Sequence, residues 1–97
     1  MMEDAGYEWD DEKAYSNARK HGVMFEEARL AFDDPKRLIM GDSAHSTGEP
    51  RYYCIGRVGE AVITVRFTQR GDKLRIIGAG RWRKGRKLYE KENSLYG

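Results

Sequence analysis

Residues that can bind and cleave a phosphodiester gather in the last third of the chain. Between Arg66 and Lys91 there are ten lysines and arginines against two acids, Asp72 and Glu90, a balance of +8. Guanidinium groups grip phosphate oxygens in pairs, and tryptophan or tyrosine rings stack unpaired bases. Basic residues interleaved with aromatic residues therefore predict a surface for a polyanion, with single-stranded RNA as the first candidate.

The candidate residues fall on one predicted strand and on the segment that follows the next strand. We expect Arg66, Arg70, Arg81 and Arg83 to bind phosphate, and Trp82 to form a platform or wall for a base. The wider set of RNA-binding candidates in this region is Arg66, Arg75, Trp82, Arg86 and Lys87. A solvated basic face, or a docking surface for an acidic protein, is the alternative interpretation of the same residues.

A ribonuclease that works without a metal also needs groups that move protons. One group removes the proton of the 2′-hydroxyl, cations stabilise the five-coordinate phosphate, and another group protonates the departing 5′-oxygen. His21 and Lys84 are the proton-transfer candidates, because imidazole changes its charge near neutral pH and Lys84 lies within the basic run. His21 also precedes Gly22 at a predicted helix end, where a histidine often only interacts with the helix dipole. Both interpretations of His21 stay open.

The rest of the composition argues against several other kinds of site. The imidazoles and the thiol are His21, His45 and Cys54, and no pair of them has metal-ligand spacing, so we expect no metal site and no cofactor. The acids at 10–12 and 26–27 are typical of helix N-terminal turns, which favour negative charge. Gly78-Ala79-Gly80 lacks the third glycine and the helix of a phosphate-binding loop.

The bulk properties predict a cytoplasmic protein. Residues 1–35 hold ten acids and four bases, a balance of −6, so the net charge of +2 hides two ends of opposite sign. A single cysteine excludes an internal disulfide framework and fits a reducing compartment. The acidic start is unlike a signal peptide, and no run approaches the roughly 20 apolar residues of a membrane span.

The predicted order of elements is helices first, then strands, then a helix. This order indicates an α+β fold, and the length indicates one domain over residues 1–97 with a core at about 7–92. A helix is predicted from the cap Asp10 to about Lys20, with Gly22 as its stop, and a second helix over 25–32. Residues 1–6 are expected to be a lead-in, and 7–9 a brief edge strand or an extended segment. About four mainly antiparallel strands are expected at 36–40, 51–57, 61–68 and 74–78, with a polar loop at 41–50 and a last helix after Gly85 that carries Leu88, Tyr89, Leu95 and Tyr96.

The period of two predicts the faces of two of these strands. In 51–57, Tyr53 and Ile55 face away from Tyr52 and Cys54, and in 61–68, Ile63, Val65 and Phe67 face away from Val62, Thr64, Arg66 and Thr68. If the last two strands pair through the turn at 69–73, Arg66 and Arg75 lie on neighbouring strands.

Two stretches resemble the BrnT family of toxins. The first, YEWDDEKAYSNARKHGVMFEEARLAFDDP, has an aromatic-Glu-Trp-Asp start, a Lys-x-x-x-Asn helix, Lys-His-Gly-Val, Phe-Glu-Glu-Ala and Asp-Asp-Pro. The second, RYYCIGRVGEAVITVRFTQRGDKLRIIGA, has an Arg-Tyr strand, Ile-Gly, Phe-Thr-x-Arg-Gly-Asp and Arg-Ile-Ile in the family's order. Together the stretches cover roughly residues 7–92.

This resemblance implies a type II toxin with a RelE-like fold: two N-terminal helices packed on the sheet, and a C-terminal helix. It implies metal-independent endoribonuclease activity on mRNA that arrests translation, a ribbon-helix-helix antitoxin partner similar to BrnA, and contact with operator DNA only through that antitoxin. By position, the catalytic candidates are His21, Arg57, Arg70, Arg81, Arg83 and Lys84, and Lys20 joins the RNA-binding set. A non-catalytic RNA-binding module, or a degenerate toxin whose basic face docks an antitoxin, is the alternative function.

One segment departs from the family pattern. Many members have Ile-Ser-Ala-Arg-x-Ala at this place, whereas Gly78 and Gly80 replace the serine and the arginine here, and Trp82 follows. The basic run before Tyr89 is one residue shorter and contains no acid. The departure indicates a Gly-Ala-Gly-x-Trp-Arg-Lys-Gly branch of the family.

Overall fold

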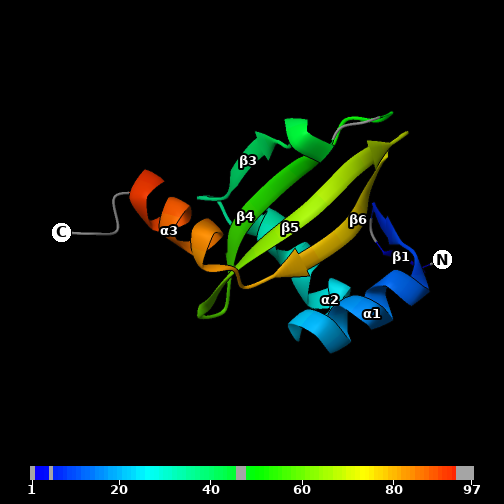
Figure 1. Ribbon diagram of the computed structural model, residues 1–97, viewed down its shortest axis with the longest axis horizontal. Coiled ribbons are helices and arrows are strands. Elements are labelled where there is room, and N and C mark those ends of the chain that lie inside the picture. The colour runs from blue at the N-terminus through cyan, green and yellow to red at the C-terminus, as the bar shows by residue number, and fades with distance from the viewer. Residues whose placement is uncertain (1, 5, 46–47, 94–97) are drawn as a thin grey trace.

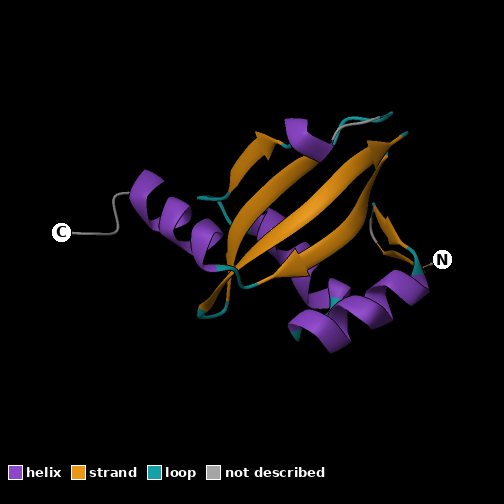
Figure 2. Cartoon of the chain, viewed as in Figure 1, coloured by secondary structure: helices purple, strands orange, loops and turns teal. Residues whose placement is uncertain are grey.

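One mixed sheet forms the centre of the computed structural model, which describes residues 2–4, 6–45 and 48–93 (Figure 1). Its six described strands are β1 (Met2–Asp4), β2 (Tyr7–Trp9), β3 (Leu38–Gly41), β4 (Tyr52–Val58), β5 (Ala61–Arg70) and β6 (Lys73–Gly80). They lie in the order β1-β2-β6-β5-β4-β3. Every neighbouring pair is antiparallel except β2 and β6, which are parallel. Figure 2 shows the strands in orange with the helices around them.

Local signals explain where the first helix begins and ends. Helix α1 spans Asp11–His21. The Asp10 carboxylate accepts hydrogen bonds from the backbone amides of Glu12 (2.9 Å) and Lys13 (3.1 Å), and Gly22 ends the helix with φ of 69°. The predicted helix is therefore confirmed. The second one is shorter than expected: α2 covers Phe25–Ala28 and continues as the 3₁₀ helix η1 over Arg29–Asp33.

The main core lies between the sheet and the N-terminal helices. In Figure 1, α1 lies below the sheet and the chain that follows α2 passes behind the strands. Alternate residues of β5 point into it, as the period of two predicts for Ile63, Val65 and Phe67. The core also contains Trp9, Val23, Phe25, Ala28, Ala31, Cys54, Ile76 and Ala79. Burial raises the pKa of the Cys54 thiol to about 12, so this cysteine is an unreactive core side chain.

A second, smaller core lies on the opposite face of the sheet beneath helix α3 (Arg83–Glu92). Tyr89 of α3 packs with Ile55 of β4 and Val62 of β5, and Leu38, Met40 and Leu88 surround them. The predicted alternation of β4, with Ile55 facing away from Cys54, is confirmed. α3 therefore covers only part of this face and leaves the rest of it for a site.

The α+β class and the mainly antiparallel sheet agree with the prediction, but the sheet is wider than the expected four strands. Residues 2–4 form β1, which pairs with β2, so the expectation of a simple lead-in at 1–6 was wrong for this part. β2 in turn pairs with β6 through Tyr7–Leu74 and Glu8–Arg75. A two-stranded ribbon thus extends the sheet at the edge next to β6.

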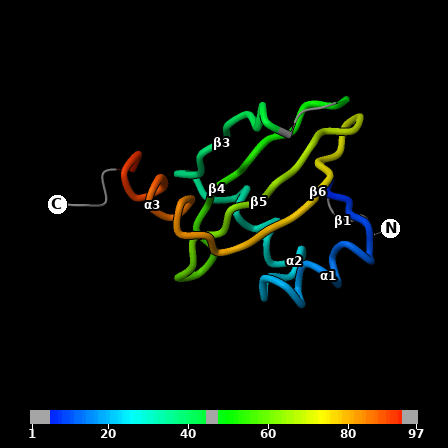
Figure 3. Tube along the Cα trace, viewed as in Figure 1, coloured from blue at the N-terminus to red at the C-terminus, as the bar shows by residue number. Residues whose placement is uncertain are grey.

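The last helix begins earlier than predicted. α3 starts at Arg83, and Gly85 lies inside it rather than before it. Gly85 is buried against β5. A Cβ at this position would overlap the Thr64 hydroxyl, so only glycine lets the first turn of α3 come this close to the sheet. The trace in Figure 3 passes from β6 into α3 through residues 81–82. Leu95 and Tyr96, also expected on this helix, lie outside the described residues.

The predicted polar connection over 41–50 begins within secondary structure. Gly41 is the last residue of β3, and Ser43–His45 form the short 3₁₀ helix η2. Positions 46 and 47 lie outside the described residues. The connection ends at Pro50, whose carbonyl accepts a 2.6 Å hydrogen bond from the buried Thr68 hydroxyl of β5.

Candidate functional site

A groove of about 230 Å³ runs between α1 and the face of the sheet that α1 does not bury. We call it the cationic groove, and its lining residues are Lys13, Ser16, Asn17, Lys20, His21, Arg66, Ile77, Gly78 and Trp82. Three elements that are distant in the sequence meet here: α1, β5 and the end of β6. The lining carries three lysine or arginine side chains and a histidine, and no carboxylate is among these residues.

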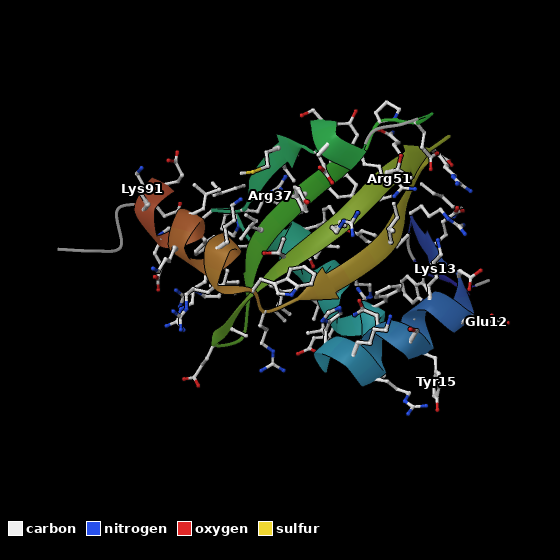
Figure 4. All side chains as sticks on the ribbon, viewed as in Figure 1. Glu12, Lys13, Tyr15, Arg37, Arg51 and Lys91 are labelled. Carbon is white, nitrogen blue, oxygen red and sulfur yellow. The ribbon has the colours of Figure 1, made fainter. Side chains whose placement is uncertain are left out.

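The helical repeat of α1 explains which of its residues line the groove. Lys13, Asn17 and Lys20 are spaced by four and three, so they share one side of the helix. Figure 4 shows Lys13 on the side of α1 toward the sheet and Tyr15 on the opposite side. His21 follows at the C-terminal end of the helix, where the backbone dipole favours positive charge.

Asn17 fixes α1 to the sheet. Its amide nitrogen donates to the carbonyl oxygens of Val23 and Ala79, both at 2.9 Å, and its amide oxygen accepts from the Ala79 backbone amide at 3.1 Å. The side chain is only 8% exposed. All three bonds are buried and use both N–H donors and the oxygen of the amide, so they hold Lys20 and His21 at a set height above β6.

Arg66 enters the groove from β5. It lies on the face opposite Ile63 and Val65, as predicted, and its register partner on β6 is Gly78. Phe67 pairs with Ile76, so Ile77 is left without a partner and forms a bulge. Gly78 has no side chain to cover Arg66, and the buried Arg66 Nε has no hydrogen-bond partner in the described part of the chain. Arg66 thus brings a positive charge to the groove from the sheet.

Trp82 closes one end of the groove. Its ring meets the His21 ring edge-on, with centroids 5.2 Å apart and planes at 76°. The indole also lies over Gly80, where a Cβ would come within 2.5 Å of the ring. Packing therefore explains part of the predicted Gly-Ala-Gly-x-Trp segment. Because Gly80 has no side chain, the Trp82 ring can lie against the backbone at this position.

A second cavity, of about 330 Å³, also borders Trp82. We call it the apolar pocket, and it is lined by Met40, Gly41, Tyr53, Ile55, Thr64, Trp82, Lys84, Gly85 and Leu88. Tyr53 and Arg66 are register partners on β4 and β5, so this pair connects the pocket to the cationic groove. Burial, a hydrogen bond to the buried Asp42 carboxylate and the charge of Asp42 raise the pKa of Tyr53, so its hydroxyl stays protonated at neutral pH.

Of the expected arginines on the strands, Arg57, Arg70 and Arg75 lie outside both cavities. Arg75 pairs with Glu8 at 3.0 Å, with both side chains more than four-fifths buried, and Arg70 pairs with Glu49 at 3.2 Å. The Arg57 guanidinium lies 6.0 Å from the ring centroid of Tyr89, at the α3 end of β4. The predicted neighbourhood of Arg66 and Arg75 on adjacent strands is correct, but Glu8 neutralises Arg75.

The basic run after β6 spreads over several surfaces. Arg81 lines a further cavity with Glu60, Ala61, Val62 and Arg86, whereas Lys84 lines the apolar pocket. Arg86 pairs with Glu90 one turn further along α3 at 3.4 Å, and Arg83 and Lys87 are exposed on the helix. Of the predicted set, the structure brings together Lys20, His21, Arg66 and Trp82 in the cationic groove, with Lys84 beside it.

Sequence reasoning missed several residues of the two cavities. Lys13 and Asn17 were noticed only as part of a family motif, although their spacing to Lys20 on a predicted helix indicates a common face. Tyr53 and Thr64 were assigned only to strand faces, since nothing local predicts which cavity a strand residue will line. Ser16 carried no signal.

Neither a metal cluster nor a membrane-spanning helix is present among the described residues. No group of three or more histidine, cysteine, aspartate or glutamate side chains in this part of the chain is arranged to hold a metal ion. No helix within the described ranges is long and apolar enough to cross a membrane.

A model of a known protein family matches most of this chain. The model described as "Ribonuclease toxin, BrnT, of type II toxin-antitoxin system" matches residues 9–85. A search of curated proteins found no match. The matched range runs from Trp9 to Gly85 and contains every residue that lines the cationic groove.

Proposed function

Because the chain belongs to the BrnT family of ribonuclease toxins of type II toxin–antitoxin systems, we propose that it cleaves mRNA in the cationic groove without a metal ion and so arrests translation. An RNA substrate and an antitoxin partner follow from family membership. The observation that carries the finer proposal is the gathering of Lys13, Lys20, His21 and Arg66 around one groove beside Trp82.

In this proposal the groove binds the scissile phosphate. The guanidinium of Arg66 grips two phosphate oxygens, and Lys13 and Lys20 add positive charge from the α1 side. The negative charge on the equatorial oxygens grows as the phosphate becomes five-coordinate. Cations already held in position stabilise that charge more than they stabilise the ground state, and this difference lowers the barrier.

The reaction is an internal transfer. The 2′-hydroxyl oxygen bonds to phosphorus and gives its proton to a base, while the bond from phosphorus to the 5′-oxygen breaks and that oxygen takes a proton. The products are a 2′,3′-cyclic phosphate and a 5′-hydroxyl end. His21 is the candidate for one proton transfer and Lys84, in the apolar pocket that Trp82 borders, for the second.

Residues outside the groove serve the flanking RNA in this proposal. Arg83, Arg86 and Lys87 on α3, and Arg81 before it, extend positive charge away from Trp82. Arg57, Arg70 and Arg75 are proposed to contribute less, because they lie outside the two cavities and Arg70 and Arg75 already hold acidic partners. The antitoxin is proposed to be a ribbon-helix-helix protein similar to BrnA, and operator DNA is reached through it.

The test is cleavage of a defined single-stranded RNA in EDTA, resolved on a sequencing gel. Wild-type protein is expected to produce discrete fragments that end in cyclic phosphate. Arg66→Ala and His21→Ala should each lower the cleavage rate about 100-fold or more. Arg19→Ala is the matched control, since Arg19 is exposed on α1 and lies over Tyr15, away from the groove.

Each outcome decides between the two candidate functions. Loss of cleavage in the groove variants, with circular dichroism unchanged and the control active, supports the site. RNA that is bound and protected but never shortened, on its own or on translating ribosomes, would favour the non-catalytic binding module. Cleavage that survives Arg66→Ala and His21→Ala would reject the groove as the active site.

A further inference from the structure

The proposed chemistry uses the cationic groove and leaves the apolar pocket with only Lys84 engaged. This pocket is formed by β3, β4, β5 and the first turn of α3. Its volume of about 330 Å³ falls within the range of small-ligand sites, and its walls combine aliphatic side chains with two aromatic rings. Such a lining suits a flat, mostly apolar group with a few polar atoms at its edge.

A buried hydroxyl without a partner lies in this pocket. Thr64 is 6% exposed, and its Oγ1 has no hydrogen-bond partner in the described part of the chain. Leaving such a group unpaired costs free energy, and most buried hydroxyls in proteins are paired. The hydroxyl lies directly under Gly85, so the first turn of α3 and Thr64 together form the floor of the pocket.

The pocket and the cationic groove share Trp82 as a common wall. A phosphate held by Arg66 would leave the attached nucleoside beside Trp82. The groove that Trp82 borders contains the cations, and the pocket that it borders contains Met40, Ile55 and Leu88. The two cavities thus match the two halves of a nucleotide, which has a charged backbone and a flat base.

We propose that the apolar pocket binds one base of single-stranded RNA next to the scissile phosphate, and that the Thr64 hydroxyl reads the edge of that base. The inference rests on the proposed function, because it takes the cationic groove as the phosphate site. Trp82 supplies the aromatic face on which the base lies, and Lys84 supplies positive charge at the rim. Cleavage would then occur preferentially next to one kind of nucleotide.

Charge favours a base over a protein side chain as the occupant. The rim of the pocket carries Lys84, and its shared wall opens on a groove that contains no carboxylate among its lining residues. An apolar anchor from a protein partner would fill the aliphatic part but would leave the Thr64 hydroxyl unpaired. A base offers donors and acceptors along its edge and satisfies that hydroxyl.

The experiment measures base preference without cleavage. Fluorescein-labelled 2′-O-methyl hexamers of adenosine, cytidine, uridine and inosine are titrated with the full chain, and anisotropy gives each Kd. The methyl group removes the nucleophile, and inosine replaces guanosine to prevent four-stranded assembly. We expect wild-type protein to prefer one hexamer by about tenfold, and Thr64→Val to lower that ratio about 3- to 10-fold, the range of one hydrogen bond.

Two further variants keep the result independent of folding. Met40→Ala enlarges the pocket and should weaken the preferred hexamer more than the others. Ile39→Ala is its matched control on the same strand, because Ile39 is 50% exposed and is not part of the pocket lining. Thr64→Val is expected to keep the fold, since valine has the same shape and removes an unpaired hydroxyl.

The outcomes separate this inference from the nuclease proposal. Equal affinity for the four hexamers, or a preference that survives both Thr64→Val and Met40→Ala, would overturn the base pocket. Hexamers with 2′-hydroxyl riboses, incubated in parallel, report cleavage alone. A base preference without cleavage, here and on translating ribosomes, would support the pocket and reject the nuclease, and cleavage without a base preference would do the reverse. Failure of every hexamer to bind at low salt would reject both.

Discussion

The side-chain amide of Asn17 acts as a substitute for a strand along β6. β2 pairs with β6 only at Leu74 and Arg75, so the same edge of β6 lacks a strand partner further along. At Ala79 the Asn17 amide both donates to the carbonyl and accepts from the amide, as a neighbouring peptide group would. One residue therefore extends the sheet onto α1 and places the groove residues.

We predict that Asn17→Ala lowers the free energy of unfolding by about 3 kcal/mol, because it leaves buried backbone groups of Val23 and Ala79 unpaired. Urea denaturation measures this change. Ser16→Ala is the control, since Ser16 is the adjacent, exposed residue in the same groove. Equal stability of the two variants would contradict the role assigned to Asn17.

At the scale of elements, α3 is held by a small core and by one partly buried polar cluster. The Asp34 carboxylate accepts from the Tyr89 hydroxyl and from the backbone amides of Arg57 (2.7 Å, Oδ2) and Lys36 (2.8 Å, Oδ1). Burial alone would raise the pKa of Asp34, but these hydrogen bonds outweigh it and hold the pKa below its usual value. The ionised carboxylate thus connects α3, β4 and the segment before β3.

We predict that Tyr89→Phe lowers the free energy of unfolding by about 1.5–3 kcal/mol at pH 7, the range for a hydrogen bond to a charged group. Because the pKa of Asp34 is lower in the folded state, its stabilising effect is present above the unfolded pKa of about 3.9 and is lost as the pH falls through the folded pKa.

The difference between wild type and Tyr89→Phe should therefore shrink when denaturation is repeated near pH 3. Tyr15→Phe, which alters a tyrosine that is 65% exposed, should change stability little at either pH. A Tyr89→Phe effect that is the same at both pH values would show that packing of the ring, and not the bond to Asp34, anchors α3.

At the scale of the whole molecule, opposite charges are separated. Residues 1–35 carry −6, with acids in the first turn of α1, while residues 66–91 carry +8. α1 itself spans the change, since Lys20 and His21 at its end face the groove. The first turn of α3 carries Arg83, Lys84 and Arg86, an arrangement that the helix dipole disfavours and an anionic ligand would relieve.

This separation predicts a salt-dependent interaction with RNA. For single strands, log Kobs falls with log salt concentration with a slope of about −0.7 for each phosphate neutralised. The double variant Arg66→Ala, Lys20→Ala should reduce the slope by about 1.4 in fluorescence titrations with a non-cleavable RNA. Arg19→Ala serves as the control, and an unchanged slope in the double variant would show that the groove does not bind phosphate.

Local features of this protein, such as helix ends and strand faces, can be predicted from residue patterns alone. Asp10 and Gly22 marked the ends of α1, and the period of two in β4 and β5 separated core residues from Arg66. These features depend on neighbours within a few positions, so they can be read from sequence. The concentration of positive charge and the family motifs indicated a ribonuclease toxin before any coordinates were known.

Only the tertiary structure decided which of the basic residues act together. His21 and Trp82 are 61 positions apart, and their contact depends on the Asn17 bonds, the bulge at Ile77 and the space above Gly80. The same packing directs Arg81 away from Trp82, and β2 brings Glu8 to neutralise Arg75. The direction of a side chain after a strand, and its partner across a sheet, follow from register and close packing over the whole chain, which no local pattern encodes.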